Sequence, residues 1–211
     1  MGKGRLTDAQ LALATAFFRS DREFFLTGGA VLAGWELQHR TTADLDLFTD
    51  KDAVSTGERT LKAAVAELGG QIETITTSPD FRRFAATIRG EQIKIDLVRD
   101  RAPQLFPKQE RDGVRMDSAE EIFTNKICTL VERNEIRDVV DLMLLEARGF
   151  RVEDYLSKAQ QKDGGATAAT LAWLLSSLEV PAELPGGVDQ QAVSRFVGDL
   201  EKRMIALAAP R

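Results

Sequence analysis

Two aspartates separated by one residue are the first candidates for chemistry in this sequence. The segment 44–48 reads Asp-Leu-Asp-Leu-Phe, and this period of two predicts a β-strand with Asp44 and Asp46 on one face. Carboxylates held so close together repel one another unless a cation lies between them. An Asp-x-Asp pair by itself, however, is also typical of a solvated strand face.

A third carboxylate, Asp96, lies about fifty residues further on, in the segment 92–98. Apolar residues alternate there with Lys94 and Asp96, which predicts a second strand of the same sheet. Three aspartates facing one way would form a site for one or two divalent ions. Two ions roughly 3.5–4 Å apart are the usual arrangement for displacement at phosphorus.

The choice of metal follows from the ligands that the chain offers. It has one cysteine, Cys128, and one histidine, His39, so an internal disulfide and zinc bound by the usual Cys and His ligands are excluded. Carboxylate oxygens favour Mg²⁺ or Mn²⁺.

A glycine pair, Gly28-Gly29, lies between a predicted strand at 24–26 and a predicted helix at 30–37. Exposed backbone N–H groups at such a turn favour an anion such as a nucleotide phosphate. The turn is not a Walker loop, because the Lys-Ser or Lys-Thr pair of that motif is missing. The same glycines would also suit a tight turn without a ligand.

The periodicity of the flanking segments predicts the elements that position these residues. Before residue 100 we expect a helix capped by Thr7, a helix at 61–68 and strands at 71–77 and 81–89. After a loop with Pro103, Pro107 and Gly113, helices are expected near 118–132, 136–148, 152–161, 166–178 and 190–207. The predicted fold class is α+β, a mixed sheet flanked by helices over residues 1–112 followed by a helical lobe over residues 113–211.

Composition narrows the class of protein. With 211 residues, 43% hydrophobic and 29% charged, the chain is typical of a soluble globular protein. Its net charge of −5 excludes a wholly basic nucleic-acid binder. No apolar run reaches the roughly 18 residues of a membrane span, and the first residues lack the apolar stretch of a secretory signal. We therefore expect a cytoplasmic protein with no membrane partner.

Basic residues outnumber acidic ones between Arg82 and Arg115. This stretch is the one feature of the composition that favours RNA as a partner. Charged residues are equally common on solvated strand faces, so both interpretations stay open.

Several segments together resemble a known family. Residues 27–32 read Thr-Gly-Gly-Ala-Val-Leu and residues 39–48 read His-Arg-Thr-Thr-Ala-Asp-Leu-Asp-Leu-Phe. They resemble the first motif of AbiEii/AbiGii-type nucleotidyltransferase toxins, members of the DNA polymerase β nucleotidyltransferase superfamily. Lys126 with Arg133, followed by Arg-Asp-Val-Val-Asp-Leu at 137–142, is similar to the later lysine and Arg-Asp-x-x-Asp-Leu motifs. These motifs extend over more than half of the chain.

The resemblance implies a nucleotidyltransferase core and a helical lobe with an NTP and Mg²⁺ (or Mn²⁺) in the cleft between them. Asp44 and Asp46 would hold the metals. Asp96 would coordinate a second metal or accept the proton of the acceptor hydroxyl; its assignment depends on strand pattern more than on a motif. The Gly28-Gly29 turn would contact the triphosphate, although the wider superfamily often has serine in place of the second glycine.

The same resemblance assigns roles to four further residues. Arg40 would contact the nucleotide, or else would fix its own loop by hydrogen bonds. Lys126 would be a catalytic cation that neutralises the triphosphate. Asp138 and Asp141, three apart on one helix face, would orient Lys126 or approach the nucleotide.

The function implied is transfer of a nucleoside monophosphate from an NTP to a hydroxyl, with release of pyrophosphate. The acceptor would be RNA, for example a tRNA 3′ end, and the protein would be the toxin of a toxin–antitoxin pair with a cognate antitoxin. Two alternatives are transfer to a small molecule such as an aminoglycoside and a catalytically idle nucleotide-binding module. A haloacid-dehalogenase-type phosphatase is disfavoured because Phe48 stands where that pattern requires threonine.

Overall fold

The computed structural model describes residues 6–209, which divide into two compact units. The first unit ends at Ser118 and the second begins at Ala119. The sequence predicted a boundary at 112/113. These two residues lie in the turn between two strands of the first unit, β6 (Gln109–Arg111) and β7 (Val114–Met116). Strands of three residues carry too little periodicity to be recognised in the sequence. The segment that was predicted to be a loop therefore contains an antiparallel β-hairpin.

The first unit is built on a mixed sheet, as predicted. The sheet has seven strands in the order β3-β4-β5-β2-β1-β7-β6, and of these β6 and β7 were not predicted. Strand β2 is parallel to β5 and β1 is parallel to β7, whereas the other neighbours are antiparallel. Its remaining elements are α1 (Asp8–Ser20), β1 (Phe25–Thr27), α2 (Gly28–Val31), the π-helical turn η1 (Leu32–Glu36), β2 (Asp44–Thr49), α3 (Val54–Glu67), β3 (Gln71–Thr77), β4 (Phe81–Ile88) and β5 (Glu91–Arg99).

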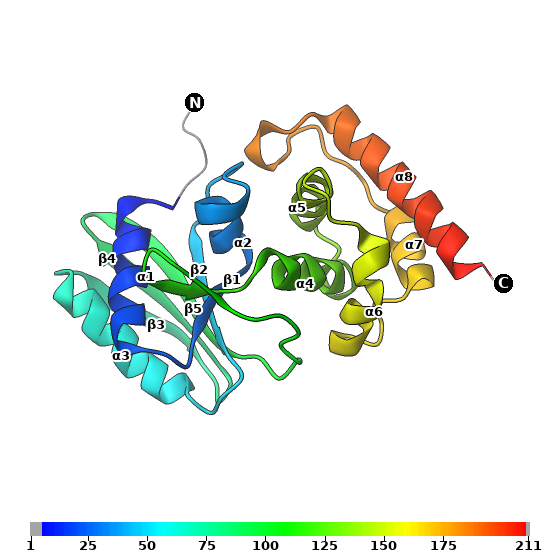
Figure 1. Cartoon of the computed structure of the whole chain (residues 1–211). Coiled ribbons are helices and arrows are strands. Elements are labelled where there is room, and N and C mark those ends of the chain that lie inside the picture. The colour runs from blue at the N-terminus through cyan, green and yellow to red at the C-terminus, as the bar shows by residue number, and fades with distance from the viewer. Residues whose placement is uncertain (1–5, 210–211) are drawn as a thin grey trace. The chain divides into compact units, whose positions relative to one another are not determined.

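Helix α1 begins where the sequence predicted. The Thr7 hydroxyl accepts a hydrogen bond from the Gln10 backbone N–H, and the Gln10 side chain accepts one from the Thr7 N–H, a complete capping box. Its apolar face buries Phe17 and Phe18. Figure 1 shows α1 (dark blue) and α3 (cyan) next to each other against the sheet.

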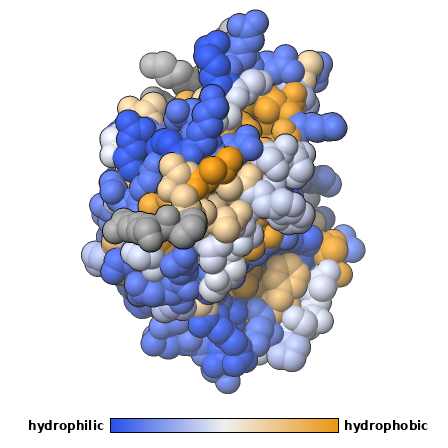
Figure 2. All heavy atoms as spheres, turned by 90° about the vertical axis from the view of Figure 1, so that its right-hand side faces the viewer, coloured by the Kyte–Doolittle hydropathy of each residue, from blue (hydrophilic) through white to orange (hydrophobic). Residues whose placement is uncertain are grey.

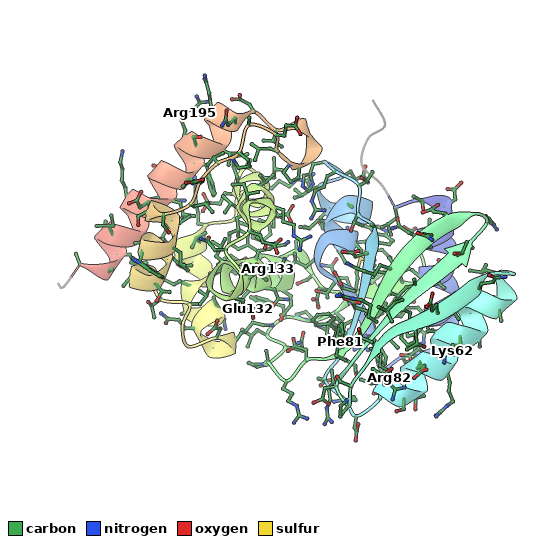
Figure 3. All side chains as sticks on the ribbon, turned by 180° about the vertical axis from the view of Figure 1, so that it is seen from behind. Lys62, Phe81, Arg82, Glu132, Arg133 and Arg195 are labelled. Carbon is green, nitrogen blue, oxygen red and sulfur yellow. The ribbon has the colours of Figure 1, made fainter. Side chains whose placement is uncertain are left out.

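The two faces of the sheet have different chemistry. Leu47 on β2, Leu97 on β5 and Arg82 on β4 lie in one register row, and Arg82 forms an ion pair with Glu58 of α3. Figure 3 shows Arg82 near α3, the helix that also carries Lys62. Because neighbouring residues of a strand point to opposite faces, Asp46 and its row lie on the face turned away from α3.

The second unit is helical, as predicted. Its elements are α4 (Ala119–Glu132), α5 (Ile136–Glu146), α6 (Val152–Lys162), α7 (Ala168–Ser176), the 3₁₀ turn η2 (Pro185–Gly187) and α8 (Gln190–Ala208). The Phe123 ring packs 5.1 Å, centroid to centroid, from both Phe150 and Tyr155, which joins α4 to α6. Within residues 6–209 no helix has the length and apolar character needed to cross a bilayer. The face in Figure 2 is mainly hydrophilic with separate hydrophobic patches.

Candidate active site

Four residues from four strands form a single row across the sheet. Thr27 of β1 is the register partner of Asp46, Asp46 is the partner of Asp96, and Asp96 is the partner of Arg83 on β4. Adjacent strands are about 4.8 Å apart, so the carboxylates of Asp46 and Asp96 project from neighbouring positions on the same face. Asp44, two residues before Asp46 on β2, shares that face. The structure thus places the three predicted carboxylates on one face of the sheet, at neighbouring positions.

The glycine turn begins beside this row. Gly28 has φ +63°, and a Cβ added to it would lie 3.2 Å from Asp46 Oδ2. Only glycine adopts that φ without strain and leaves room for the carboxylate. The backbone of residue 28 therefore runs directly beside Asp46, and an anion bound at the turn would lie next to any cation held by Asp46.

Arg40 covers the second glycine. A Cβ on Gly29 would lie 3.1 Å from Arg40 Nη2 and 3.6 Å from Thr42 Oγ1. The guanidinium thus occupies the space into which the serine of related motifs would extend. It also donates to the Thr41 carbonyl over 3.3 Å, so Arg40 both fixes its loop and places a positive charge at the turn.

Next to the glycine turn, Asp117 binds both Thr27 and Lys108, a contact that sequence reasoning missed. Thr27 Oγ1 donates to Asp117 Oδ2 over 2.5 Å, and Lys108 Nζ donates to Asp117 Oδ1 over 2.5 Å. Lys108 Nζ also lies 3.7 Å from the centroid of the Phe25 ring. Asp117 is fully buried, which makes this contact strong in a low-dielectric setting. No local sequence pattern predicts the contact between Lys108 and Asp117, because these residues stand at the two ends of the hairpin that was not recognised.

Two cations face the carboxylates. Arg83 donates from Nε to Asp96 Oδ1 over 2.8 Å and from Nη2 to Asp96 Oδ2 over 2.7 Å, and Lys94 Nζ lies 2.9 Å from Asp44 Oδ1. The hydrogen bonds to Asp96, with the negative charges of Asp96, Asp44 and Asp46, raise the pKa of Arg83 above its ordinary value. All three negative charges therefore act on the same guanidinium.

The donor set suits Mg²⁺ or Mn²⁺, since it consists of carboxylate oxygens on adjacent positions of one face. Within residues 6–209, no three acidic, His or Cys side chains are already gathered as a metal-binding group. The ion pairs explain why: Asp96 is directed at Arg83 and Asp44 at Lys94. A metal ion bound by these carboxylates would therefore compete with Arg83 and Lys94 for them.

The predicted residues of the second unit form a separate, buried cluster. Lys126 Nζ of α4 lies 2.6 Å from Asp138 Oδ1 and 2.7 Å from Asp141 Oδ2, both on α5. Arg133, labelled in Figure 3 near the end of α4, donates from Nε to Asp138 Oδ2 over 2.8 Å. The side chains of Asp138 and Asp141 have no exposed surface. Of the two roles that the sequence left open, this geometry favours orientation of Lys126 over contact with a nucleotide.

The charge balance of the cluster is visible in Asp138. Burial alone would raise the pKa of this carboxyl, but the charges and hydrogen bonds of Lys126 and Arg133 outweigh it and hold the pKa below its ordinary value. Asp138 is therefore ionised at neutral pH.

The basic stretch between Arg82 and Arg115 does not gather on one face. Arg82 pairs with Glu58 of α3, Arg83 with Asp96 on the opposite face, and Arg101 with Asp80. Because these cations meet carboxylates of their own unit, the excess of basic residues in the sequence does not by itself mark an RNA-binding surface.

The chain resembles known proteins over nearly its whole length. A family model described as "Nucleotidyl transferase AbiEii toxin, Type IV TA system" matches residues 11–202. Among solved structures, JHP933 from Helicobacter pylori is 18% identical with a TM-score of 0.59, covering 94% of this chain and 92% of that one. MenT4, a nucleotidyltransferase toxin from Mycobacterium tuberculosis, is 14% identical with a TM-score of 0.52, covering 94% and 85%. These structural similarities show the fold alone. No curated protein matches the sequence.

Proposed function

Because this chain belongs to the AbiEii family of nucleotidyl transferase toxins of type IV toxin–antitoxin systems, we propose that it moves a nucleoside monophosphate from an NTP to a hydroxyl on RNA in a metal-dependent reaction. The enzyme class, nucleotidyltransferase, is the one that the motifs predicted. The observation that carries the proposal is the row Thr27–Asp46–Asp96 with Gly28 against Asp46.

The reaction exchanges one bond at phosphorus for another. The acceptor oxygen forms a bond to the α-phosphorus of the NTP, and the bond from that phosphorus to the bridging oxygen breaks. Pyrophosphate leaves with the electron pair, and the hydroxyl proton passes to a carboxylate or to water. Such transfers depend mainly on positioning and on neutralising charge.

The residues of the first unit divide this work. The backbone N–H groups of Gly28 and Gly29 bind the phosphates, and Arg40 adds a positive charge at the same turn. Asp44 and Asp46 would hold the first ion, and Asp96 would hold a second ion or take the proton of the attacking hydroxyl. A divalent ion bound there would activate the attacking oxygen and neutralise charge on the phosphates.

Lys126 is paired with two aspartates of the helical unit. Its two ion pairs fix α4 against α5, and this is the role that we propose for it together with Asp138 and Asp141. Neutralisation of the triphosphate by Lys126, and nucleotide contacts of the two aspartates, stay predictions from the motif.

The experiment that tests the function offers each of the four α-³²P-labelled NTPs, with Mg²⁺ or Mn²⁺, to tRNA and to total RNA. We expect label on RNA from the wild-type chain, loss of label on chelation, and no label from Asp46→Asn. Label on hydroxylated small molecules but not on RNA would replace the acceptor with an aminoglycoside-type substrate. Metal-dependent NTP binding without transfer to any acceptor would indicate an idle module.

The biological setting follows from the same proposal. NTPs and tRNA place the reaction in the cytoplasm, and a cognate antitoxin would counteract it. Expression of the wild-type chain should arrest growth, and expression of Asp46→Asn should not.

A further inference from the structure

Arg83 is held in place by the carboxylate that the proposed reaction needs. Its guanidinium forms two parallel hydrogen bonds with Asp96 and lies 5.3 Å from the centroid of the Phe81 ring. The Asp96 side chain is 10% exposed and that of Arg83 is 39% exposed. A planar guanidinium matches a carboxylate or a phosphate equally well, so a half-exposed Arg83 can exchange one for the other.

The position of Arg83 in the row places it on the acceptor side of the site, away from the triphosphate. The order across the sheet is glycine turn, Asp46, Asp96 and then Arg83. In-line displacement places the attacking oxygen opposite the leaving pyrophosphate. If the triphosphate lies at the glycine turn, as the proposed function requires, the acceptor approaches from the Arg83 end of the row.

Arg83 and a divalent ion compete for Asp96. Both are cations, and the bidentate pair engages both carboxylate oxygens. An ion that uses Asp96 must therefore displace the guanidinium, and the guanidinium then needs another anion.

We propose that Arg83 is the acceptor-side residue of the site: it neutralises Asp96 in the metal-free protein, gives Asp96 up to a divalent ion, and then binds a backbone phosphate of the RNA acceptor. This inference rests on the proposed function. It adds a specificity element, because an arginine at this place favours a phosphate-bearing acceptor and repels a polycationic one such as an aminoglycoside.

The chain provides a matched control for the test. Arg82 is the next residue on the same strand, carries the same charge and pairs with Glu58 on the other face of the sheet. Arg83→Gln and Arg82→Gln thus change the net charge identically, but only the first frees Asp96. Arg83→Lys keeps the charge without the two-pronged geometry.

The first measurement is Mn²⁺ affinity without nucleotide, from the free-ion electron paramagnetic resonance signal. We expect Arg83→Gln to bind Mn²⁺ about three- to fivefold more tightly than wild type, the change that up to about 1 kcal/mol of lost competition produces. Arg82→Gln should stay near wild type and Arg83→Lys should fall between. Equal Mn²⁺ affinity in the Arg83→Gln and Arg82→Gln variants would overturn the proposal, and so would weaker binding in Arg83→Gln.

The second measurement is binding of a fluorescently labelled tRNA with a 3′-deoxy end, which cannot accept a nucleotide, in the presence of Mn²⁺. Arg83→Gln should bind this RNA more weakly and lower the slope of log affinity against log salt by about 1, the loss of one phosphate contact. A slope unchanged from wild type and Arg82→Gln would overturn the acceptor role. A misfolded variant would not combine tighter metal binding with weaker RNA binding.

Asp46→Asn separates this inference from the function on which it rests. Mn²⁺ binding by wild type that Asp46→Asn abolishes, with no gain in Arg83→Gln, contradicts the role of Arg83 alone. No Mn²⁺ binding by either wild type or Arg83→Gln contradicts the metal site and the role of Arg83 together.

Discussion

The cation–aspartate cluster of the sheet and that of the helical unit differ in exposure. On the sheet face turned away from α3, Arg83 and Lys94 are 39% and 41% exposed, and their partners Asp96 and Asp44 are 10% and 28% exposed. In the helical unit Lys126 is 6% exposed, and its partners Asp138 and Asp141 are 0% exposed. The cations of the first cluster are accessible to a charged ligand, whereas the second cluster is buried within the helical unit.

Exposure determines which of these ion pairs are available for chemistry. A partly solvated pair contributes little to stability, about 0–1 kcal/mol, because water competes for both charges. A buried pair with one partner removed leaves an uncompensated charge, at a cost of about 3–5 kcal/mol. The sheet cluster can therefore exchange partners at low cost, and the helical cluster cannot.

The largest expected effect is on activity at the sheet cluster. Asp46→Asn should lower nucleotide transfer by about 10³-fold or more, because loss of a metal ligand removes several kcal/mol of charge stabilisation. Its urea-unfolding free energy should equal or exceed that of wild type, since one repelling carboxylate is gone. Retained transfer, measured with labelled NTP, would remove Asp46 from the site.

The next effect is on stability at the helical cluster. Lys126→Met should lower the free energy of unfolding by about 3–5 kcal/mol, because Asp138 and Asp141 lose their shared cation in a buried setting. Arg83→Met, which removes the half-exposed partner of Asp96 from a face that water reaches, should cost about 1 kcal/mol or less. Urea denaturation followed by circular dichroism measures both losses. Equal losses would contradict the difference between the two clusters.

A smaller effect depends on pH. The pKa of Asp138 is below its unfolded value of 3.8, so its contribution to stability is complete above about pH 5 and is lost as the pH falls further. Asp138→Asn has no carboxyl to protonate at this position. The free energy of unfolding of that variant should therefore fall less than that of wild type between about pH 5 and pH 3, and an equal fall would contradict the assignment.

The smallest effect concerns the thiol on α4. Burial raises the pKa of Cys128 to about 12, so the native chain should react very slowly with iodoacetamide at pH 8 and readily in guanidinium chloride. Lys126→Met should accelerate labelling, and Asp46→Asn should not. Rapid labelling of the native wild type would show that the helical unit is less tightly closed than its contacts indicate.

Much of this molecule could be predicted from local sequence. The alternation of Asp44, Leu45, Asp46 and Leu47 fixed both a strand and the face of its carboxylates, because side chains alternate strictly along a strand. The capping residues around Thr7 fixed the start of α1 for an equally local reason. The glycine turn and the family motifs were recognisable in the same way.

Contacts between distant strands and helices, by contrast, depend on the fold. That Asp96 stands opposite both Asp46 and Arg83, that Arg40 fills the space beside Gly29, and that Lys108 reaches Asp117 all depend on strand order and register. Nothing in the neighbouring residues encodes such pairs, because they arise when distant segments are brought together by burial of the core. The acidic residues of the candidate site could thus be read from local sequence, whereas the cations that pair with them follow from strand register.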